Sequence, residues 1–349
     1  MKLGPGKLLS YALWQLRRHK LTTCCSMSTK AILCPGQGTQ YIGMFDDQWS
    51  KSNILREIVK TSKDILGEDV IGIGNDGPLS KLSLTKYCQP AVVLSSILTF
   101  EHLKEAGDLQ HASIKAIAGY SVGELSSLYM AGCISFENMM KIVRVRADVM
   151  QHASNAHNTG MLTIQGIPKE KIQELCHELN SLQTDSKNHV NIAIEMYPMS
   201  TVIGGTVKIL DGIVERGHPL LKEPSIKLSR LPVSGAFHTP YMESAQEGLN
   251  DILHKIEINT APLENPDFKV YSNVTGKPFK STDNIRDLLV KQICEPVKWT
   301  NIIQDVNLMF KEKKLDSILE LGPGNNLQSI LGKINRRAIR VTQSLDLNS

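Results

Sequence analysis

The sequence predicts an α/β protein in which a small βαββαβ subdomain is inserted into a large domain with a parallel sheet. From residue 31 onward, short apolar runs alternate with helical stretches. Three of these runs end in glycine-rich turns that open helices. This is typical of parallel α/β sheets, whose sites lie at the carboxyl ends of the strands. Between about residues 158 and 228 the spacing changes to four shorter strands and two helices, which is the order of a ferredoxin-like unit.

Residues 1–29 are predicted to be a mitochondrial transit peptide. No acidic residue occurs before Asp46, and basic residues alternate with leucines at helical spacing. This pattern is typical of amphipathic presequences. Arg17 and Arg18 interrupt the apolar run that a secretory signal would need. A disordered basic tail is the alternative.

The large domain is predicted to comprise residues 30–157 and 229–349. Its strands are expected at Ala31–Cys34, Ile114–Ala118 and Ser317–Leu321, each followed by a glycine-rich turn. A body of roughly 300 residues is long enough to bury a large core.

The small subdomain is predicted to comprise residues 158–228. Its helices and strands are short, and each apolar run is bounded by turn residues. The elements are expected, in chain order, at Met161–Ile167, Lys169–Asn180, Val190–Met196, Thr201–Gly204, Val207–Arg216 and Ser225–Leu228.

The segment Gly119–Gly123 matches the G-x-S-x-G pattern of a nucleophile elbow. A predicted strand precedes it and a helix of small residues over Glu124–Ala131 follows, so the motif has the α/β-hydrolase-like context that it requires. The hydroxyl of Ser121 would project from the turn, and the helix N-terminus would offer amide hydrogens to a developing oxyanion. We therefore predict Ser121 as a nucleophile. The alternative is an ordinary turn serine.

A serine hydroxyl needs a base before it can act as a nucleophile. Of the ten histidines, His238 is the favoured candidate, because it lies in the glycine- and proline-bounded loop 232–240 after an apolar run. A structural or exposed histidine is the alternative.

Arg146 is predicted to be buried on the helix Phe136–Ala153. The residues three and four positions away from it are all apolar: Ile142, Val143, Val149 and Met150. Arg144, by contrast, has Asp148 as a neighbour and is expected at the surface. A buried guanidinium needs an anionic partner, which is either a distant acidic residue or a substrate carboxylate held by the planar fork.

Composition excludes several classes of protein. The 39 basic and 35 acidic residues give a net charge of +4, too small for a dedicated nucleic-acid binder. No run approaches the ~18 apolar residues of a membrane-spanning helix. The seven cysteines are scattered apart from Cys24-Cys25 and no HExxH occurs, so neither a disulfide framework nor a metal site is expected. Gly72–Gly77 matches G-x-G-x-x-G, but Pro78 follows at once, so a loop is predicted there rather than a dinucleotide site.

In combination, eight motifs resemble those of the malonyl-CoA:acyl carrier protein transacylases, and most closely the mitochondrial animal form. The resemblance extends over residues 31 to about 343. The motifs occur in the family's order, at Pro35–Gln40, Cys88–Ala91, Gly119–Glu124, Arg144–Gln151, Gly235–His238, Tyr271–Val274, Pro296–Trp299 and Glu320–Gly324.

The resemblance implies the catalytic groups. Ser121 would be the nucleophile and His238 its base. A main-chain carbonyl near Gln292 would orient the imidazole in place of an acidic third member. The backbone amides of Gln37 and Val122 would form the oxyanion hole.

The resemblance also implies the substrate-binding groups. Arg146 would bind the malonyl carboxylate. Gln89 and Gln292 would line the pocket. Phe237 would leave no room for an α-methyl group, which favours malonyl over methylmalonyl.

The activity implied is that of an acyl-carrier-protein S-malonyltransferase. The malonyl group would pass from malonyl-CoA to the phosphopantetheine thiol of acyl carrier protein through a malonyl-serine intermediate, and would supply fatty acid synthesis in the mitochondrial matrix. No cofactor, metal, nucleic acid or membrane is expected. The acidic carrier should meet a basic patch, for which the candidates are Lys227, Arg230, Lys333, Arg336 and Arg337.

Three positions depart from the family's pattern. Tyr120 replaces a histidine of bacterial members and is expected to form a pocket wall. Cys34 replaces a phenylalanine. The segment Ile194–Met196 lacks the asparagine that the family often has there, so no contact of the subdomain with the site is expected.

Two other functions remain open from the residues alone. A serine hydrolase, such as a thioesterase or lipase, would need an acidic residue between Ser121 and His238, and Asp148, Asp185 and Asp211 lie in that window. A non-catalytic interaction protein could also keep the fold.

Overall fold

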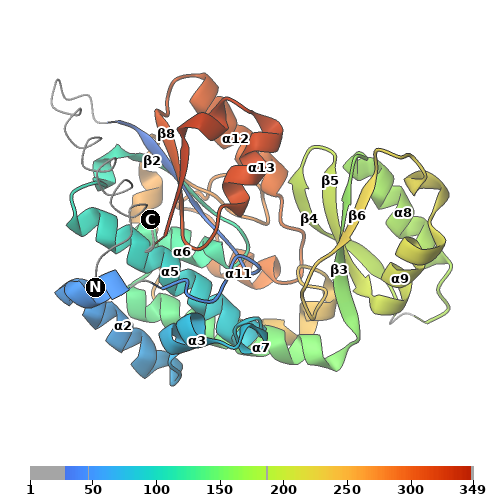
Figure 1. Cartoon of the computed structure of the whole chain (residues 1–349), viewed down its shortest axis with the longest axis horizontal. Helices are drawn as coiled ribbons and strands as arrows, with labels where there is room; N and C mark the ends of the chain where they lie inside the picture. The colour runs from blue at the N-terminus through green and yellow to red at the C-terminus, as the bar shows by residue number, and fades with distance from the viewer. Residues whose placement is uncertain (1–27, 46, 186–187, 347–349) are drawn as a thin grey trace, which may run out of the picture.

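The computed structural model describes residues 28–45, 47–185 and 188–346 (Figure 1). The predicted transit peptide lies outside the described residues, apart from its last two positions. The Thr29 amide donates to Asp316 Oδ2 at 2.7 Å, and the Thr29 carbonyl accepts from the amides of Asp316 and Ser317. Thr29, which lies just before the first strand, is therefore bound to residues 316 and 317.

The large domain is built on a five-stranded parallel sheet. Its order is β7-β2-β1-β8-β9, so β1 is central. The three strands predicted from the sequence are the three adjacent central ones. The bounds are Lys30–Cys34 for β1, Ile114–Gly119 for β2, Lys269–Val270 for β7, Ser317–Leu321 for β8 and Thr342–Leu345 for β9.

Helices surround this sheet. Helix α5 is buried around its whole circumference from Tyr87 to Phe100, which is why this stretch is mainly apolar and carries no charged residue on any side. The helices are α2 (Asn53–Leu66), α3 (Val70–Asp76), α4 (Leu79–Leu82), α5 (Thr85–Glu105), α6 (Gly123–Met130), α7 (Phe136–Ala156), α10 (Gln246–His254), α11 (Ile285–Gln292), α12 (Trp299–Lys311) and α13 (Asn326–Ile334). Short 3-10 turns occur at Asp47–Lys51, His111–Ser113, Pro219–Leu221, Pro240–Ala245, Ala261–Glu264 and Ala338–Val341.

A second, four-stranded antiparallel sheet projects to one side of the large domain, at the right of Figure 1. Its order is β4-β5-β3-β6, and two helices cover its outer face. The elements in chain order are β3 (Thr159–Gln165), α8 (Lys169–Ser181), β4 (Val190–Tyr197), β5 (Ser200–Thr206), α9 (Val207–Arg216) and β6 (Lys227–Arg230).

Both faces of this smaller sheet are apolar. Successive side chains of a strand point to opposite faces, so neighbouring apolar residues of one strand belong to different cores. Leu162 and Ile203 pack with α8 and α9 in a core of their own. Their neighbours Met161 and Val202 belong instead to the core of the large domain. The small subdomain is thus packed onto the large one through its second face.

The edge strand β4 is also joined to the large domain by its backbone. The Glu195 amide donates to the Val297 carbonyl at 2.9 Å, and the Val297 amide donates to the Ala193 carbonyl at 3.0 Å. An edge strand has unpaired backbone groups, and here the segment before α12 pairs with them.

The loop predicted at Gly72–Gly77 is wrong, because Val70–Asp76 form helix α3. Asp69 caps this helix by accepting from the Gly72 amide at 2.9 Å. A Cβ at Gly74 would lie 2.6 Å from the Phe45 ring, so this glycine allows close packing. No described helix has both the length and the apolarity needed to span a membrane.

Candidate active site

Ser121 lies in a sharp turn between β2 and α6. Its φ of +55° is in the left-handed region that non-glycine residues rarely adopt. A Cβ at Gly119 would lie 1.9 Å from the Gly123 carbonyl oxygen, and a Cβ at Gly123 would lie 2.3 Å from the Cys34 carbonyl oxygen. Both flanking glycines of the motif are therefore required by backbone contacts, as in a nucleophile elbow.

Asn273 holds the strained turn from the loop after β7. Its Oδ1 accepts from the Ser121 amide at 2.8 Å, and its Nδ2 donates to the Gly119 carbonyl at 2.7 Å. Sequence reasoning assigned no role of its own to Asn273. Its position in the Tyr271–Val274 motif was the signal that could have pointed to it.

The structure brings Ser121 and His238 together. Ser121 Oγ lies 2.7 Å from His238 Nε2, and His238 Nδ1 lies 2.6 Å from the main-chain carbonyl of Gln292. His238 also has a positive φ of +61°, and its amide donates to the Ile293 carbonyl at 3.0 Å. A carbonyl oxygen therefore occupies the place that a carboxylate would have in a triad.

The hydrogen bond to this carbonyl determines which nitrogen of His238 carries the proton. Because a carbonyl can only accept, Nδ1 is the protonated nitrogen and Nε2 is free to accept from the serine hydroxyl. Burial lowers the pKa of His238 to about 3, and the positive charge of Arg146 adds to this effect. The imidazole is therefore neutral at physiological pH, as a general base must be.

Arg146 is 2% exposed and extends toward Ser121 from α7. Its Nη1 donates to Gln89 Oε1 at 2.6 Å and its Nη2 donates to Gln292 Oε1 at 2.8 Å. Nη2 also lies 3.4 Å from Ser121 Oγ. Burial lowers the pKa of Arg146 to about 10, so the guanidinium is still charged at neutral pH. Both of its strong partners are neutral amides, and no described carboxylate forms an ion pair with it.

Two backbone amides beside Ser121 have no partner. In the part of the chain that the structure describes, neither the Gln37 amide nor the Val122 amide donates a hydrogen bond. Gln37 follows β1 and Val122 immediately follows the serine, so both lie at the carboxyl ends of neighbouring strands. Free amides in such a position can stabilise an oxyanion.

A cavity of about 190 Å³ opens at Ser121 and His238. Phe237 and Tyr120 form part of its wall, and the Tyr120 ring packs edge-on against Trp299 with centroids 5.1 Å apart. Gln89 lines it as predicted, whereas neither Gln292 nor Arg146 is among its lining residues. Arg146 lies next to the cavity through its bond to Gln89 and its 3.4 Å approach to Ser121 Oγ. The rest of the wall is mainly apolar: Met150, Met161, Ile194, Met196, Leu231, Pro232, Val233, Leu327 and Ile330.

The expectation that the small subdomain makes no contact with the site is therefore wrong. Ile194 and Met196 of β4 and Met161 of β3 line the cavity. These are apolar contacts, which do not depend on the asparagine that is missing from this strand.

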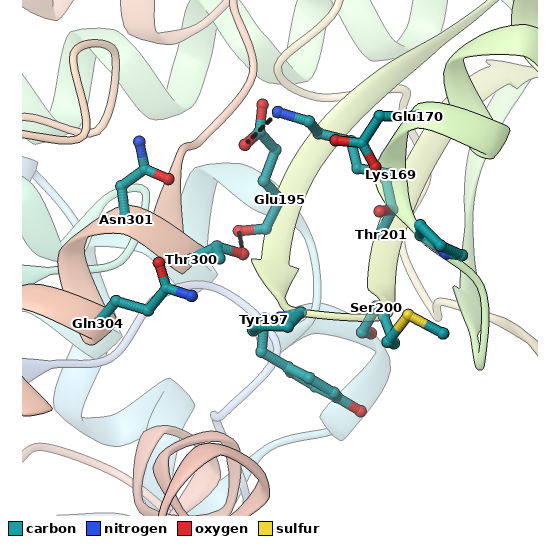
Figure 2. Close-up of a pocket in the computed structure, with 12 residues that line it drawn as sticks. Lys169, Glu170, Glu195, Tyr197, Ser200, Thr201, Thr300, Asn301 and Gln304 are labelled. Atoms are coloured by element: carbon teal, nitrogen blue, oxygen red, sulfur yellow. Dashed lines mark hydrogen bonds and ion pairs between the residues drawn. The ribbon is translucent and has the colours of Figure 1, made fainter.

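The alternate residues of β4 face a second hollow, of about 280 Å³, between the small subdomain and α12. Figure 2 shows Glu195 and Tyr197 at its wall, opposite Thr300 of α12. Lys169 Nζ pairs with Glu195 Oε2 at 3.2 Å, and Thr300 Oγ1 donates to the Glu195 carbonyl at 3.1 Å (Figure 2). None of the predicted site residues lines this hollow. Its polar contacts connect β4 to α8 and to α12.

The basic residues suggested for carrier docking are not gathered on one surface. Arg230 on β6 pairs with Asp211 on α9. Arg336 and Arg337 line a separate hollow with Asp316, which lies at the amino end of β8. The cavity with Ser121 lies at the opposite, carboxyl end of the sheet. Of the five candidates, only Lys333 belongs to an element that lines the cavity, α13, and Lys227 and Arg230 lie on β6, just before the lining residue Leu231.

Comparisons with known proteins agree with one another. The family model described as "Acyl transferase domain" matches residues 32–333. A Drosophila melanogaster protein named "Probable malonyl-CoA-acyl carrier protein transacylase, mitochondrial" is 35% identical over 89% of this chain and 80% of its own length. The Homo sapiens "Malonyl-CoA-acyl carrier protein transacylase, mitochondrial" is 30% identical over 96% and 83%. A solved malonyl-transacylase, described in complex with its type II PKS acyl-carrier protein, has a TM-score of 0.75 and 29% identity over 91% of this chain and 95% of that one.

Proposed function

This chain belongs to the acyl transferase domain family, and we propose that it transfers malonyl groups from malonyl-CoA to the phosphopantetheine thiol of acyl carrier protein. The enzyme is a mitochondrial acyl-carrier-protein S-malonyltransferase, as its fly and human relatives are named. Its product would serve mitochondrial fatty acid synthesis in the matrix. The relative solved in complex with an acyl-carrier protein supports the choice of acceptor.

The placement of Arg146 carries this proposal. The guanidinium is buried within 3.4 Å of the Ser121 hydroxyl oxygen, and its strong partners are the amide oxygens of Gln89 and Gln292. Since neutral amides leave the positive charge unbalanced, an anionic group is needed there. The carboxylate at the far end of a malonyl thioester supplies that charge when its carbonyl carbon is at Ser121.

In the first half-reaction, His238 Nε2 takes the proton of Ser121 as the serine oxygen attacks the thioester carbonyl. The oxyanion is held by the Gln37 and Val122 amides, and one such donor is typically worth about 3–4 kcal/mol. The intermediate then collapses and breaks the carbon–sulfur bond. The leaving coenzyme A sulfur takes the proton from His238, and malonyl-Ser121 remains.

The second half-reaction reverses these steps with a different thiol. His238 Nε2 accepts the proton of the carrier's phosphopantetheine thiol, whose sulfur attacks the ester carbonyl. Collapse of the second tetrahedral intermediate returns the proton to Ser121 Oγ and releases malonyl-carrier protein. Every proton and leaving group is accounted for without a resident cofactor or metal, and we propose that none is required.

Phe237 and Tyr120 are the groups that we expect to limit the acyl group. Phe237 adjoins His238 and is 6% exposed, so an added α-methyl group would meet its ring. Tyr120 directly precedes the nucleophile, and burial raises the pKa of its hydroxyl, so it stays neutral and acts as a wall.

We further infer that the small subdomain is a ferredoxin-like unit inserted between residues 30–157 and 229–349 of a hydrolase-like large domain. The βαββαβ chain order and the antiparallel sheet order β4-β5-β3-β6 support this assignment. The predicted limits were 158–228, and β6 extends the unit to Arg230.

Intact-protein mass spectrometry tests the proposed function. Protein mixed with malonyl-CoA should gain one malonyl group, and peptide mapping should place it on Ser121. Ser121→Ala should gain none. Addition of phosphopantetheinylated carrier should remove the adduct faster than water does. Faster release to water would instead indicate a serine hydrolase, and no adduct at all would indicate a non-catalytic protein.

A further inference from the structure

Gln292, at the end of α11, contacts each part of the catalytic arrangement. Its main-chain carbonyl accepts from His238 Nδ1, and its side-chain Oε1 accepts from Arg146 Nη2. Its side-chain Nε2 donates to the Ser121 carbonyl at 3.0 Å and to Glu124 Oε2 at 2.5 Å. The orientation of this one amide therefore affects the guanidinium that is proposed to bind the substrate carboxylate.

The two ends of an amide are chemically different, since the oxygen only accepts and the nitrogen only donates. With the amide reversed, its nitrogen would face the Arg146 guanidinium, donor against donor. Its oxygen would then face the Ser121 carbonyl, acceptor against acceptor, and Glu124 Oε2 would lose the donor from which it accepts. The acceptors on the far side of Gln292 therefore determine which end is offered to Arg146.

Glu124 is the nearer of these two acceptors to the Gln292 amide nitrogen. It lies in the first turn of α6, is 0% exposed, and also accepts from the Asn273 amide at 3.2 Å. Its other oxygen, Oε1, is buried without a hydrogen-bond partner among the described residues. Burial raises the pKa of Glu124 to about 8, although the bonds from Gln292 and Asn273 and the charge of Arg146 act against this shift.

A buried carboxyl group with an unpaired oxygen destabilises a fold. An apolar residue at this first turn of the helix would remove that cost. A local arrangement that costs stability is expected where it serves the site.

We propose that Glu124 is a positioning residue that fixes the Gln292 amide with its oxygen toward Arg146, and thereby aims the guanidinium at the carboxylate of the malonyl group. Glu124 acts through Gln292, since it forms no hydrogen bond or ion pair with Ser121 Oγ, His238 or the Arg146 guanidinium among the described residues, and it does not line the cavity. The inference rests on the proposed function, because it assigns how the same site recognises its substrate.

Two substitutions separate the acceptor from the ionisable group. Glu124→Gln removes the ionisable carboxyl group and keeps a carbonyl oxygen of the same reach for Gln292. Glu124→Asp keeps the carboxyl group and withdraws the acceptor by one methylene. Ser126→Ala is the matched control, because Ser126 is a buried residue of the same helix whose hydroxyl has no partner among the described residues.

The experiment measures loading of Ser121 from malonyl-CoA and from acetyl-CoA by intact mass, together with KM and kcat for malonyl-CoA. Glu124→Asp should lose about tenfold or more of the preference for malonyl over acetyl, through a raised malonyl-CoA KM. Glu124→Gln should keep the preference within about threefold, and Ser126→Ala should match the wild type.

Two results would overturn the inference. One is a Glu124→Asp protein that loads both acyl groups more slowly by the same factor, which would indicate a general structural role. The other is a Glu124→Gln protein that loses as much preference as we expect of the Asp variant. This second result is decisive even if Glu124→Asp does not fold. Failure of the proposed function would look different, because the wild-type protein itself would then form no malonyl adduct.

Discussion

At the scale of single residues, Arg146 is the side chain whose burial is hardest to explain without a substrate. It is a buried cation held by two neutral amides. Glutamine oxygens satisfy its hydrogen-bond donors but do not balance its charge, so part of the desolvation cost is left for a ligand to offset. An arginine in a solvent-exposed ion pair would contribute little to stability.

Arg146→Ala should therefore reduce malonyl loading much more than acetyl loading. Losing one partner of a buried charged pair costs roughly 2–5 kcal/mol, so kcat/KM for malonyl-CoA should fall by about 100-fold or more. Arg144→Ala is the matched control on the same helix, because Arg144 is exposed and bonds only the Ile65 carbonyl. Equal loss for both acyl groups would contradict the assignment of the carboxylate to Arg146.

The acid limb of the pH–rate profile should not follow an ordinary histidine. The pKa of His238 is lowered from 6.5 to about 3, so the free base persists as the pH falls through 6. kcat/KM measured between pH 5 and 8 should show no loss that titrates near 6.5. The prediction is contradicted if kcat/KM falls with decreasing pH around a midpoint of 6.5 and this fall is absent from the residual, slower activity of His238→Gln. The imidazole would then be less shielded from water than its burial implies.

Sequence patterns could single out Ser121, His238 and Arg146 as candidates because each is marked by its near neighbours in the chain, whereas their roles were implied by the family resemblance. The roles of Asn273 and Glu124 depend instead on partners about 150 residues away. A motif that contains these residues shows that they recur together but not which hydrogen bonds they form. Gln292 was expected in the pocket lining, whereas in the structure it does not line the cavity and accepts from Arg146 instead.

At the scale of secondary-structure elements, the turn between β2 and α6 depends on the absence of side chains at two positions. Gly119→Ala should prevent this turn from forming, since its Cβ would lie 1.9 Å from the Gly123 carbonyl oxygen. We expect a loss larger than the roughly 1–3 kcal/mol of an overpacked core, measured by thermal or denaturant unfolding.

Gly160→Ala is the control for that prediction. Gly160 is also a strand residue, in β3, but the nearest atom to an added Cβ is 3.5 Å away. The free energy of unfolding of the Gly160→Ala protein should stay within about 1 kcal/mol of the wild-type value. If the two variants were equally stable, the close approach at the elbow would not be what requires glycine.

The elements themselves were predicted well where the hydrophobic period was clear. The helix Val207–Arg216 has the predicted bounds, and the β3, β4 and β5 strands differ from prediction by at most two residues at either end. Helix α3 was missed because its two glycines and the following proline indicate a turn. The Asp69 cap and the burial of Val70, Ile71 and Ile73 outweigh that local preference.

At the scale of the whole molecule, Glu124 should make stability depend on pH. Its folded-state pKa is raised from 4.5 to about 8, so the folded protein holds a proton that the unfolded chain releases. The stability contributed by this proton is complete below pH 4.5 and is lost as the pH rises through 8. His238 acts oppositely, because its lowered pKa removes stability as the pH falls from 6.5 toward 3.

Glu124→Gln should therefore gain stability relative to the wild type as the pH rises. The difference in melting temperature between the two proteins should increase from pH 5 to pH 8.5, and calorimetry or circular dichroism would measure it. A difference that stays constant over this range would mean that the carboxyl group titrates normally.

The complete site could not be derived from the chain order alone, because it is assembled from loops after β1, β2 and β7, from α7 and α11, and from both subdomains. The expectation that the small subdomain stays away from the site failed for this reason. Its basis was one missing polar residue, whereas Met161, Ile194 and Met196 reach the cavity as apolar wall. This apolar wall can be recognised only in the folded structure, where the small subdomain packs against the core of the large domain.

The pairing of β4 with Val297 has a consequence for how this enzyme can diversify. The link consists of main-chain amides and carbonyls, and every residue type except proline supplies both. Mutations at Ile194 or Met196 can thus reshape the acyl chamber while the strand stays docked. Selection for new acyl specificity can act on this wall without first having to rebuild its attachment.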